Sequence, residues 1–221
     1  MNVAGWLKFG RRQGDSGPFS ETTPLGDLRY AVLDTELTSL DSRSNRLLSI
    51  GAVAMEGSRI RLGEQFYCVV NPGVEVPSQT VLVHRLRPHD VERGDALQDA
   101  LAGLQGFVAG RVLVGHFVNV DLKVLRKELG DESHKLSNPA IDTARVHQWI
   151  LHHGPYREDL ERQLQDVSLA SLARRYDLEF REAHNALDDA FVTARLWQKL
   201  LHRLESLKVR TLGDLLRAGR A

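Results

Sequence analysis

Three apolar segments of strand length follow one another in the first third of the chain, and this succession limits it to folds built on a sheet. The segments are YAVLDTEL (30–37), RLLSIGAVAMEG (46–57) and RIRLGEQFYCVVNP (59–72). Short apolar runs are typical of buried strands, and the third segment alternates with the period of a strand that has one wetter face. The residues Glu56-Gly57-Ser58 join the last two segments, which predicts a hairpin.

The pattern after residue 95 changes to helices with two further strands between them. A loop with several prolines precedes this part. The predicted helices are 95–110, 119–130, the end of 139–153, 168–178, 183–204 and 211–219, and the predicted strands are 111–116 and the start of 139–153. Thr211 is the expected N-cap of the last helix. This order of elements predicts an α/β domain around a mixed sheet.

Charge and cysteine content limit the function classes. Lys plus Arg is 29 and Asp plus Glu is 29, and this balance disfavours a protein that coats long duplex DNA, which is usually basic. The single cysteine, Cys68, excludes an internal disulfide and a cysteine-based zinc cluster, and it favours a reducing, cytoplasmic setting. The first ten residues are too short and mixed for a signal-peptide core, and no apolar run has the length of a membrane span. We therefore expect no membrane partner.

Carboxylates stand where strands end and helices begin. Asp34 and Glu36 follow the apolar run YAVL, and residues two apart on a strand point to the same face, so both side chains are expected to face one point. Asp121 follows the run RVLVGH at the start of a helix. Asp189 lies near the start of the long helix, with His184 five residues before it. The four carboxylates and the histidine are therefore candidates for one site.

Such an oxygen-rich set suits Mg²⁺ or Mn²⁺ better than zinc. Two ions roughly 3.5–4 Å apart can hold an attacking hydroxide and a leaving oxygen on either side of a phosphorus, and a nearby histidine can accept a proton from the water. Each residue also has an ordinary explanation: a strand end in solvent, a charge that complements a helix dipole, or a solvated helix face. Only their combination favours a metal site.

Three stretches that carry these residues resemble the motifs of the DEDDh 3′–5′ exonuclease superfamily, which includes the DNA polymerase III epsilon subunit, ribonuclease T and oligoribonuclease. The stretches are DTE (34–36), HFVNVD (116–121) and HNALDD (184–189). The third fits the pattern His-x-Ala-x-x-Asp, and the Tyr-x-x-x-Asp pattern of the sister group is absent. The resemblance covers roughly residues 29–203. It leaves 1–28 as an N-terminal extension and 204–221 as a C-terminal helical extension.

The resemblance implies a ribonuclease H-like exonuclease fold, with a five-stranded mixed sheet flanked by helices. It implies that two Mg²⁺ or Mn²⁺ ions are bound by four carboxylates and that His184 is the general base. Those ligands are Asp34, Glu36, Asp121 and Asp189. It also implies hydrolysis from the 3′ end of single-stranded DNA or short RNA, with release of nucleoside 5′-monophosphates. Leu37, Thr38 and His84 match positions that line the terminal-nucleotide pocket in relatives.

The second motif departs from the family pattern His-Asn-x-x-Phe-Asp. Phe117 stands where Asn is expected, and Val120 stands where Phe is expected. This departure affects substrate preference rather than metal binding. Phe117 is a candidate substrate contact through stacking on a base. A packing role fits it equally, and we favour packing.

Two other functions compete with an active exonuclease. One is a catalytically idle nucleic-acid-binding module that keeps the fold, although clustered carboxylates repel one another without metal and argue against it. The other is a polymerase-accessory role in proofreading, with a DNA polymerase as partner in addition to single-stranded 3′ ends. Asp142, at the end of a predicted strand, and His147, among apolar residues of a predicted helix, are expected to be structural. The sequence leaves the oligomeric state open.

Overall fold

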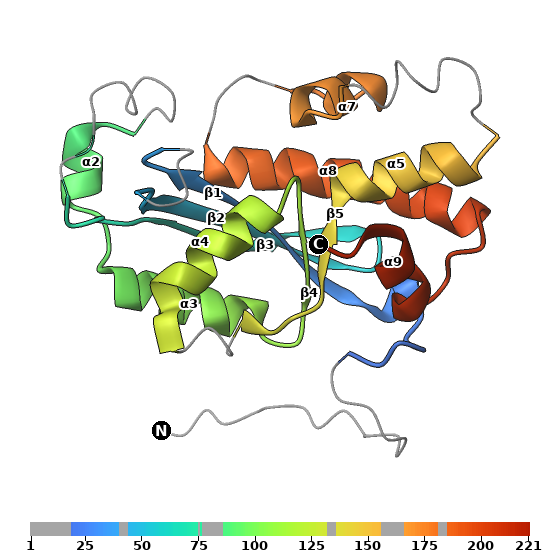
Figure 1. The fold of residues 1–221 in the computed structure, drawn as a ribbon, viewed down its shortest axis with the longest axis horizontal. Helices are drawn as coiled ribbons and strands as arrows, with labels where there is room; N and C mark the ends of the chain where they lie inside the picture. Colours follow the sequence, from blue (N-terminus) through green and yellow to red (C-terminus); the bar gives the residue numbers. More distant parts are fainter. Residues whose placement is uncertain are drawn as a thin grey trace.

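A computed structural model describes residues 19–39, 44–74, 76, 86–131, 136–155, 166–180 and 185–221. Five strands in this part of the chain form one mixed sheet in the order β3-β2-β1-β4-β5 (Figure 1). The strands are β1 (Arg29–Leu37), β2 (Leu47–Glu56), β3 (Arg59–Val69), β4 (Val112–Gly115) and β5 (Ala140–Asp142). β1 pairs antiparallel with β2 and parallel with β4. The predicted five-stranded mixed sheet and the β2–β3 hairpin are confirmed.

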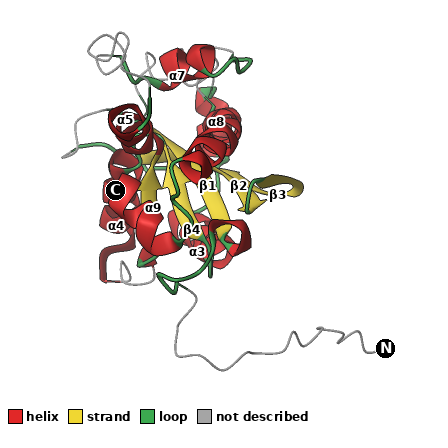
Figure 2. Ribbon diagram, turned by 90° about the vertical axis from the view of Figure 1, so that its right-hand side faces the viewer, coloured by secondary structure: helices red, strands yellow, loops and turns green. Residues whose placement is uncertain are grey.

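Helices cover both faces of this sheet (Figure 2). The α-helices are α2 (Pro88–Glu92), α3 (Leu97–Val108), α4 (Asn119–Leu129), α5 (Thr143–His153), α7 (Leu169–Arg175), α8 (Ala186–Ser206) and α9 (Leu212–Gly219). α5 and α8 lie on one face, with α7 outside them, and α3 and α4 lie on the other. Apart from α2, these helices match those predicted from the sequence.

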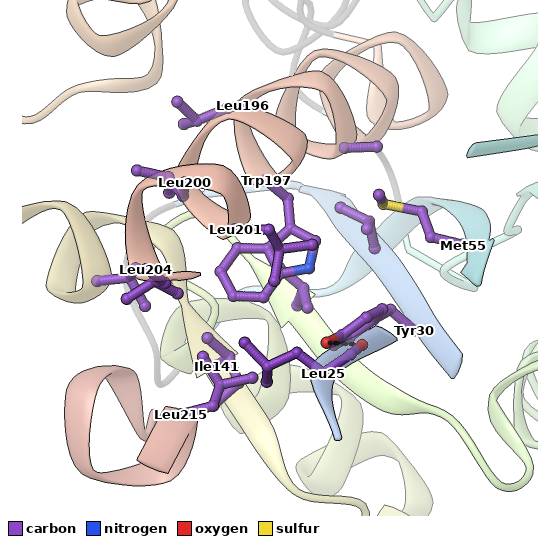
Figure 3. Close-up of a cluster of buried hydrophobic side chains, with 14 of the residues drawn as sticks. Leu25, Tyr30, Met55, Ile141, Leu196, Trp197, Leu200, Leu201, Leu204 and Leu215 are labelled. Atoms are coloured by element: carbon purple, nitrogen blue, oxygen red, sulfur yellow. Dashed lines mark hydrogen bonds between the residues drawn. The ribbon is translucent and has the colours of Figure 1, made fainter. Parts of the chain in front are cut away.

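Alternation along β1 assigns each of its side chains to one of two cores. Tyr30 and Val32 belong to the core under α5 and α8, and Ala31 and Leu33 belong to the core under α3 and α4. The Trp197 ring of α8 packs edge-on against the Tyr30 ring at a centroid distance of 5.7 Å (Figure 3). Side chains alternate strictly along a strand. The even-numbered residues at the end of β1 therefore face α8.

The short helix α2 and the residues before β1 differ from the sequence-based picture. α2 was expected to be loop; it begins with Pro88, which is favourable in the first turn of a helix, and five residues are too few for a periodic pattern. Leu25 and Leu28, within the predicted N-terminal extension, are buried in the core. The Leu25 amide donates to the Arg210 carbonyl at 2.9 Å, so this segment lies against the chain that leads into α9.

The C-terminal helix α9 packs on α5 and β5 and begins at the predicted cap. The Thr211 hydroxyl accepts from the Asp214 amide, and the Asp214 side chain accepts in return from the Thr211 amide. The Ala221 amide donates to the Ala140 carbonyl at 2.9 Å, which closes the edge of β5. Among the helices of the described residues, none combines the length and the apolar character that crossing a bilayer requires.

Candidate active site

Carboxylates from β1 and α8 meet at the end of β1. Asp34, Glu36 and Asp189 each offer an oxygen, and these oxygens all lie within 4.8 Å of one another. We call these three residues the carboxylate cluster. Glu36 is only 6% exposed, and Asp34 is partly buried. Two side chains two residues apart on β1 therefore do share a face, and a third comes from a helix more than 150 residues later in the chain.

Gly51 explains how the start of α8 comes so close to β1. Gly51 is the register partner of Asp34 on β2. A Cβ atom placed on Gly51 would lie 2.2–2.3 Å from the backbone atoms of Ala186 and Leu187, where no side chain fits. The first turn of α8 thus rests directly on the backbone of β2, beside Asp34. An isolated glycine in a strand pattern indicates close backbone approach. Gly51 in the segment SIGAV is such a glycine, although it was not among the predicted site residues.

Tyr67 and Asn185 hold the same helix start from its other side. Tyr67 on β3 is the register partner of Gly51, so Asp34, Gly51 and Tyr67 form one row across three strands. The Asn185 side-chain nitrogen donates to the Tyr67 hydroxyl at 3.3 Å, and the Asn185 side-chain oxygen Oδ1 caps α8 by accepting from the Leu187 amide at 3.0 Å. No sequence pattern predicts this contact between residues 118 positions apart.

Asp121 reaches β1 from the opposite face of the sheet. It lies in the first turn of α4 and is 6% exposed. One of its carboxylate oxygens accepts from the Thr35 amide at 2.9 Å and from the Thr35 hydroxyl at 2.6 Å. Thr35 stands between Asp34 and Glu36, and its side chain points toward α4. Asp121 is thus tied to the strand that carries the cluster, and the sequence did not reveal the part of Thr35.

Burial and like charge raise the pKa of Asp34 and of Asp121. Burial raises the pKa of Asp34 well above its usual value, and the charges of Asp121, Glu36 and Asp189 raise it further. Burial also raises the pKa of Asp121 to about 7, against the lowering effect of its hydrogen bonds from Thr35. Repulsion of this kind is relieved by protonation or by a bound cation. Oxygen donors without sulfur or nitrogen fit Mg²⁺ or Mn²⁺.

The other predicted site residues fall into two groups. His184 and His84 lie outside the described residues. Leu37 is 7% exposed and packs in the core under α3 and α4. The Thr38 hydroxyl accepts from the Arg46 amide at 2.9 Å. A substrate contact by either residue stays a prediction. Phe117 is 46% exposed and its ring contacts the His116 ring, with centroids 4.6 Å apart, so it is not a core residue, and its substrate contact stays a prediction.

Comparison with known proteins gives a consistent result. A family model described as exonuclease matches residues 31–197. The chain is 26% identical over 181 residues to a DNA polymerase III subunit epsilon of Aquifex aeolicus, covering 81% of this chain and 84% of that protein. It is 25% identical over 200 residues to a PolC-type DNA polymerase III of Thermotoga maritima and 29% identical over 197 residues to an epsilon-like protein of Rhodobacter capsulatus. These two alignments cover 89% and 88% of this chain, but only 14% and 27% of the two relatives.

Solved structures share the fold. E. coli Exonuclease I in complex with a dT13 oligonucleotide superposes with a TM-score of 0.68 at 16% identity, over 82% of this chain and 43% of that one. The cell-death related nuclease CRN-4 superposes with a TM-score of 0.65 at 16% identity, over 80% of this chain and 64% of that one. The expected ribonuclease H-like exonuclease fold is thereby confirmed.

Proposed function

The chain belongs to the exonuclease family, and on that premise we propose that it removes nucleotides from the 3′ end of single-stranded DNA or short RNA as nucleoside 5′-monophosphates. The observation that supports this most directly is the carboxylate cluster, whose three oxygens lie within 4.8 Å. Partly buried like charges at this separation repel one another, and a bound cation relieves that repulsion. A binding module would gain nothing from that repulsion, whereas a phosphodiesterase site needs bound cations at this place.

The proposed ligands of two Mg²⁺ or Mn²⁺ ions are the cluster and Asp121. When bound, such ions neutralise the phosphate and lower the pKa of a water molecule. The chain's own residues do the rest. Thr35 holds Asp121 in place through two hydrogen bonds, and the seat of α8 on Gly51 holds Asp189 against β1. His184, which precedes the cap residue Asn185 directly in sequence, is the proposed acceptor of the proton from the attacking water.

The test compares two adjacent carboxylates of α8. Asp189 belongs to the cluster, while Asp188 is exposed in the same helical turn. With a labelled single strand and Mn²⁺ or Mg²⁺, the wild type should shorten the strand stepwise from its 3′ end, and EDTA should stop it. Asp189→Asn should lose more than the roughly 10- to 100-fold that is typical when an outer partner of a metal ligand is removed. Asp188→Asn should stay near the wild type.

Equal losses in both variants would contradict a specific role of Asp189. Strand binding without any shortening by the wild type, in either metal, would instead identify the chain as an idle nucleic-acid-binding module. Matched DNA and RNA strands of several lengths, tested side by side, would assign the substrate class.

We also propose a DNA polymerase as a partner. The support is that two of the relatives are named as PolC-type DNA polymerase III and as its epsilon subunit. A proofreading role requires the 3′ end to pass between two active sites, so the two proteins must associate. Co-purification of the tagged chain with a replicative polymerase would support the partnership. Elution of the mixture as two separate species, identified by light scattering, would contradict it.

A further inference from the structure

The turn that leads from β4 into α4 lacks the features that usually fix the start of a helix. Asp121 lies in the first turn of α4, yet the N-cap residue Val118 makes no side-chain hydrogen bond to the helix. Phe117, the residue before Val118, has a φ of +54°, which bulky side chains rarely adopt. Strain of this kind persists only where neighbouring groups enforce it. The position of Asp121 therefore depends on contacts from outside the turn.

Asp142, the last residue of β5, joins this strained turn to the start of α5. It is the register partner of Gly115 at the end of β4, and it is buried. Its Oδ1 accepts from the Phe117 amide at 3.3 Å and from the Ala144 amide at 2.9 Å, and the second bond caps α5. A single buried carboxylate oxygen thus holds the backbone of the turn and the first turn of the neighbouring helix.

Thr143, the first residue of α5, adds a second connection between the same segments, and it is fully buried. Its hydroxyl donates to the Gly115 carbonyl at 3.2 Å and is hydrogen-bonded to Nδ1 of His116 at 2.8 Å. The His116 ring lies edge-on to the Phe117 ring, with centroids 4.6 Å apart. Thr143 therefore ties both residues that precede Phe117 to α5.

The turn passes these constraints on to the carboxylates through Asp121. Four residues separate Phe117 from Asp121, and the Asp121 carboxylate accepts from the Thr35 amide at 2.9 Å. Thr35 lies on β1 between two acids of the carboxylate cluster. Groups that orient a metal ligand without touching the metal commonly affect metal affinity. A chain of hydrogen bonds therefore runs from the start of α5 to the strand that carries the cluster.

We propose that Asp142 and Thr143 are positioning residues for Asp121, and that they set the affinity of the site for a divalent cation by fixing the turn before α4. This inference rests on the proposed function, in which Asp121 is a cation ligand. The hydrogen bonds described for both side chains end on backbone groups and on His116. Their loss should therefore weaken the binding of the cation even when no strand is bound.

The test measures Mn²⁺ binding to the full chain without nucleic acid, by following the paramagnetic resonance signal of the free ion. Thr143→Val keeps the shape of the side chain and removes the hydroxyl. It should weaken Mn²⁺ binding roughly 10-fold, at the lower end of the effect of removing an outer partner of a metal ligand. Thr143→Ser keeps the hydroxyl and should bind Mn²⁺ nearly as well as the wild type. Asp142→Asn keeps an acceptor oxygen and should bind Mn²⁺ more tightly than Asp142→Ala.

Thr211→Val is the matched control for a merely structural role. The Thr211 hydroxyl also holds a helix start, since it accepts from the Asp214 amide in α9. Thr211 forms a β-bridge with Pro24, ahead of β1, whereas the cluster lies at the other end of that strand. Thr211→Val should lower the unfolding temperature in EDTA and leave Mn²⁺ affinity unchanged. Unchanged affinity in Thr143→Val, or an equal loss in Thr143→Ser or Thr211→Val, would overturn the positioning role.

A wild type that binds no Mn²⁺ would refute the proposed function, and amide hydrogen exchange in EDTA would then decide on the positioning role. The Thr35 amide donates to the Asp121 carboxylate, so its exchange reports on the placement of that carboxylate. Relative to the amides of β2, the Thr35 amide should exchange faster in Thr143→Val than in Thr211→Val. Equal relative rates in the two variants would overturn the positioning role.

Discussion

Two groups of buried ionisable residues lie on the α5–α8 side of the sheet, and the protein treats them in opposite ways. At the end of β1, carboxylates crowd together and their like charges raise the pKa of Asp34. Between α5, α7 and α8, the buried His147 has a partner at each ring nitrogen. Its Nδ1 lies 2.9 Å from the Tyr176 hydroxyl, and its Nε2 lies 2.9 Å from the Arg175 guanidinium.

In the second group, both ring nitrogens of His147 are hydrogen-bonded within the protein. Arg175 can only donate, so His147 accepts at Nε2 and carries its proton on Nδ1, which donates to Tyr176. Burial, followed by the charges of Arg175 and Arg203, lowers the pKa of His147 to about 4 and keeps the ring neutral. A buried polar group with complementary partners at each of its nitrogens stabilises the fold, whereas like charges that crowd together favour the binding of an external cation. The structural role predicted for His147 agrees with its full burial.

The largest effect is expected from Asp34→Asn. It removes one of the like charges and one proposed ligand, so nuclease activity should fall below detection. The metal-free protein should nevertheless unfold at a higher temperature than the wild type, because the repulsion between Asp34 and the neighbouring carboxylates is gone. Activity assays and thermal unfolding in EDTA measure both effects. A variant that is inactive and also less stable in EDTA would mean that the cluster holds the fold together.

A smaller effect is expected from Gly51→Ala. The added methyl group meets the backbone of Ala186 and Leu187, so the first turn of α8 must move away from β2 and carry Asp189 with it. We expect activity to fall about 100-fold, since a displacement of about 1 Å at an active site can cost that much. Gly63→Ala is the matched control, because nothing lies within 4 Å of its added methyl. Equal activity of the two variants would contradict the seating of α8 on Gly51.

The smallest effect concerns the pH dependence of stability in EDTA. His147 has a folded pKa of about 4 against 6.5, so the unfolded chain binds the extra proton between these values and stability falls as pH falls. Asp121 has a folded pKa of about 7 against 3.8, so the folded state binds the extra proton and stability falls as pH rises. The two slopes oppose each other between about pH 4 and 6.5.

Denaturant titrations of two variants separate these slopes. His147→Gln removes the contribution of the histidine, so that only the contribution of the carboxyl groups remains. The stability of this variant should decrease from pH 4 to 7, and saturating Mn²⁺ should remove that decrease. Asp121→Asn should lose less stability over this range than His147→Gln does, because the opposing contribution of His147 is kept and, of the two raised carboxyl pKa values, only that of Asp34 remains. Each one-unit pKa shift corresponds to about 1.4 kcal/mol, so the His147 contribution is on the order of 3 kcal/mol. Parallel profiles for both variants would contradict the assignment of the slopes.

The fold followed from local patterns. Strand length, the hairpin at Gly57 and the periodicity of α3 and α8 each depend on neighbours in sequence, and all of them agree with the structure. The pairing of Asp34 with Glu36 followed in the same way, because alternation on a strand is a local rule. Helix α2 was missed, since five residues leave no period to recognise.

Contacts between distant residues were decided only by the tertiary structure. Asp121 and Asp189 were predicted from the sequence, but the contacts that hold them at β1 were not. Thr35 binds Asp121, and Gly51 with the pair Tyr67–Asn185 positions the start of α8. The packing role favoured for Phe117 was a sequence-based expectation. Neither the exposure of this residue nor its φ can be inferred from its neighbours in the sequence. Chain geometry sets which residues can form a strand or a helix. Which backbones come into van der Waals contact depends on how whole elements pack, and no window of neighbouring residues contains that information.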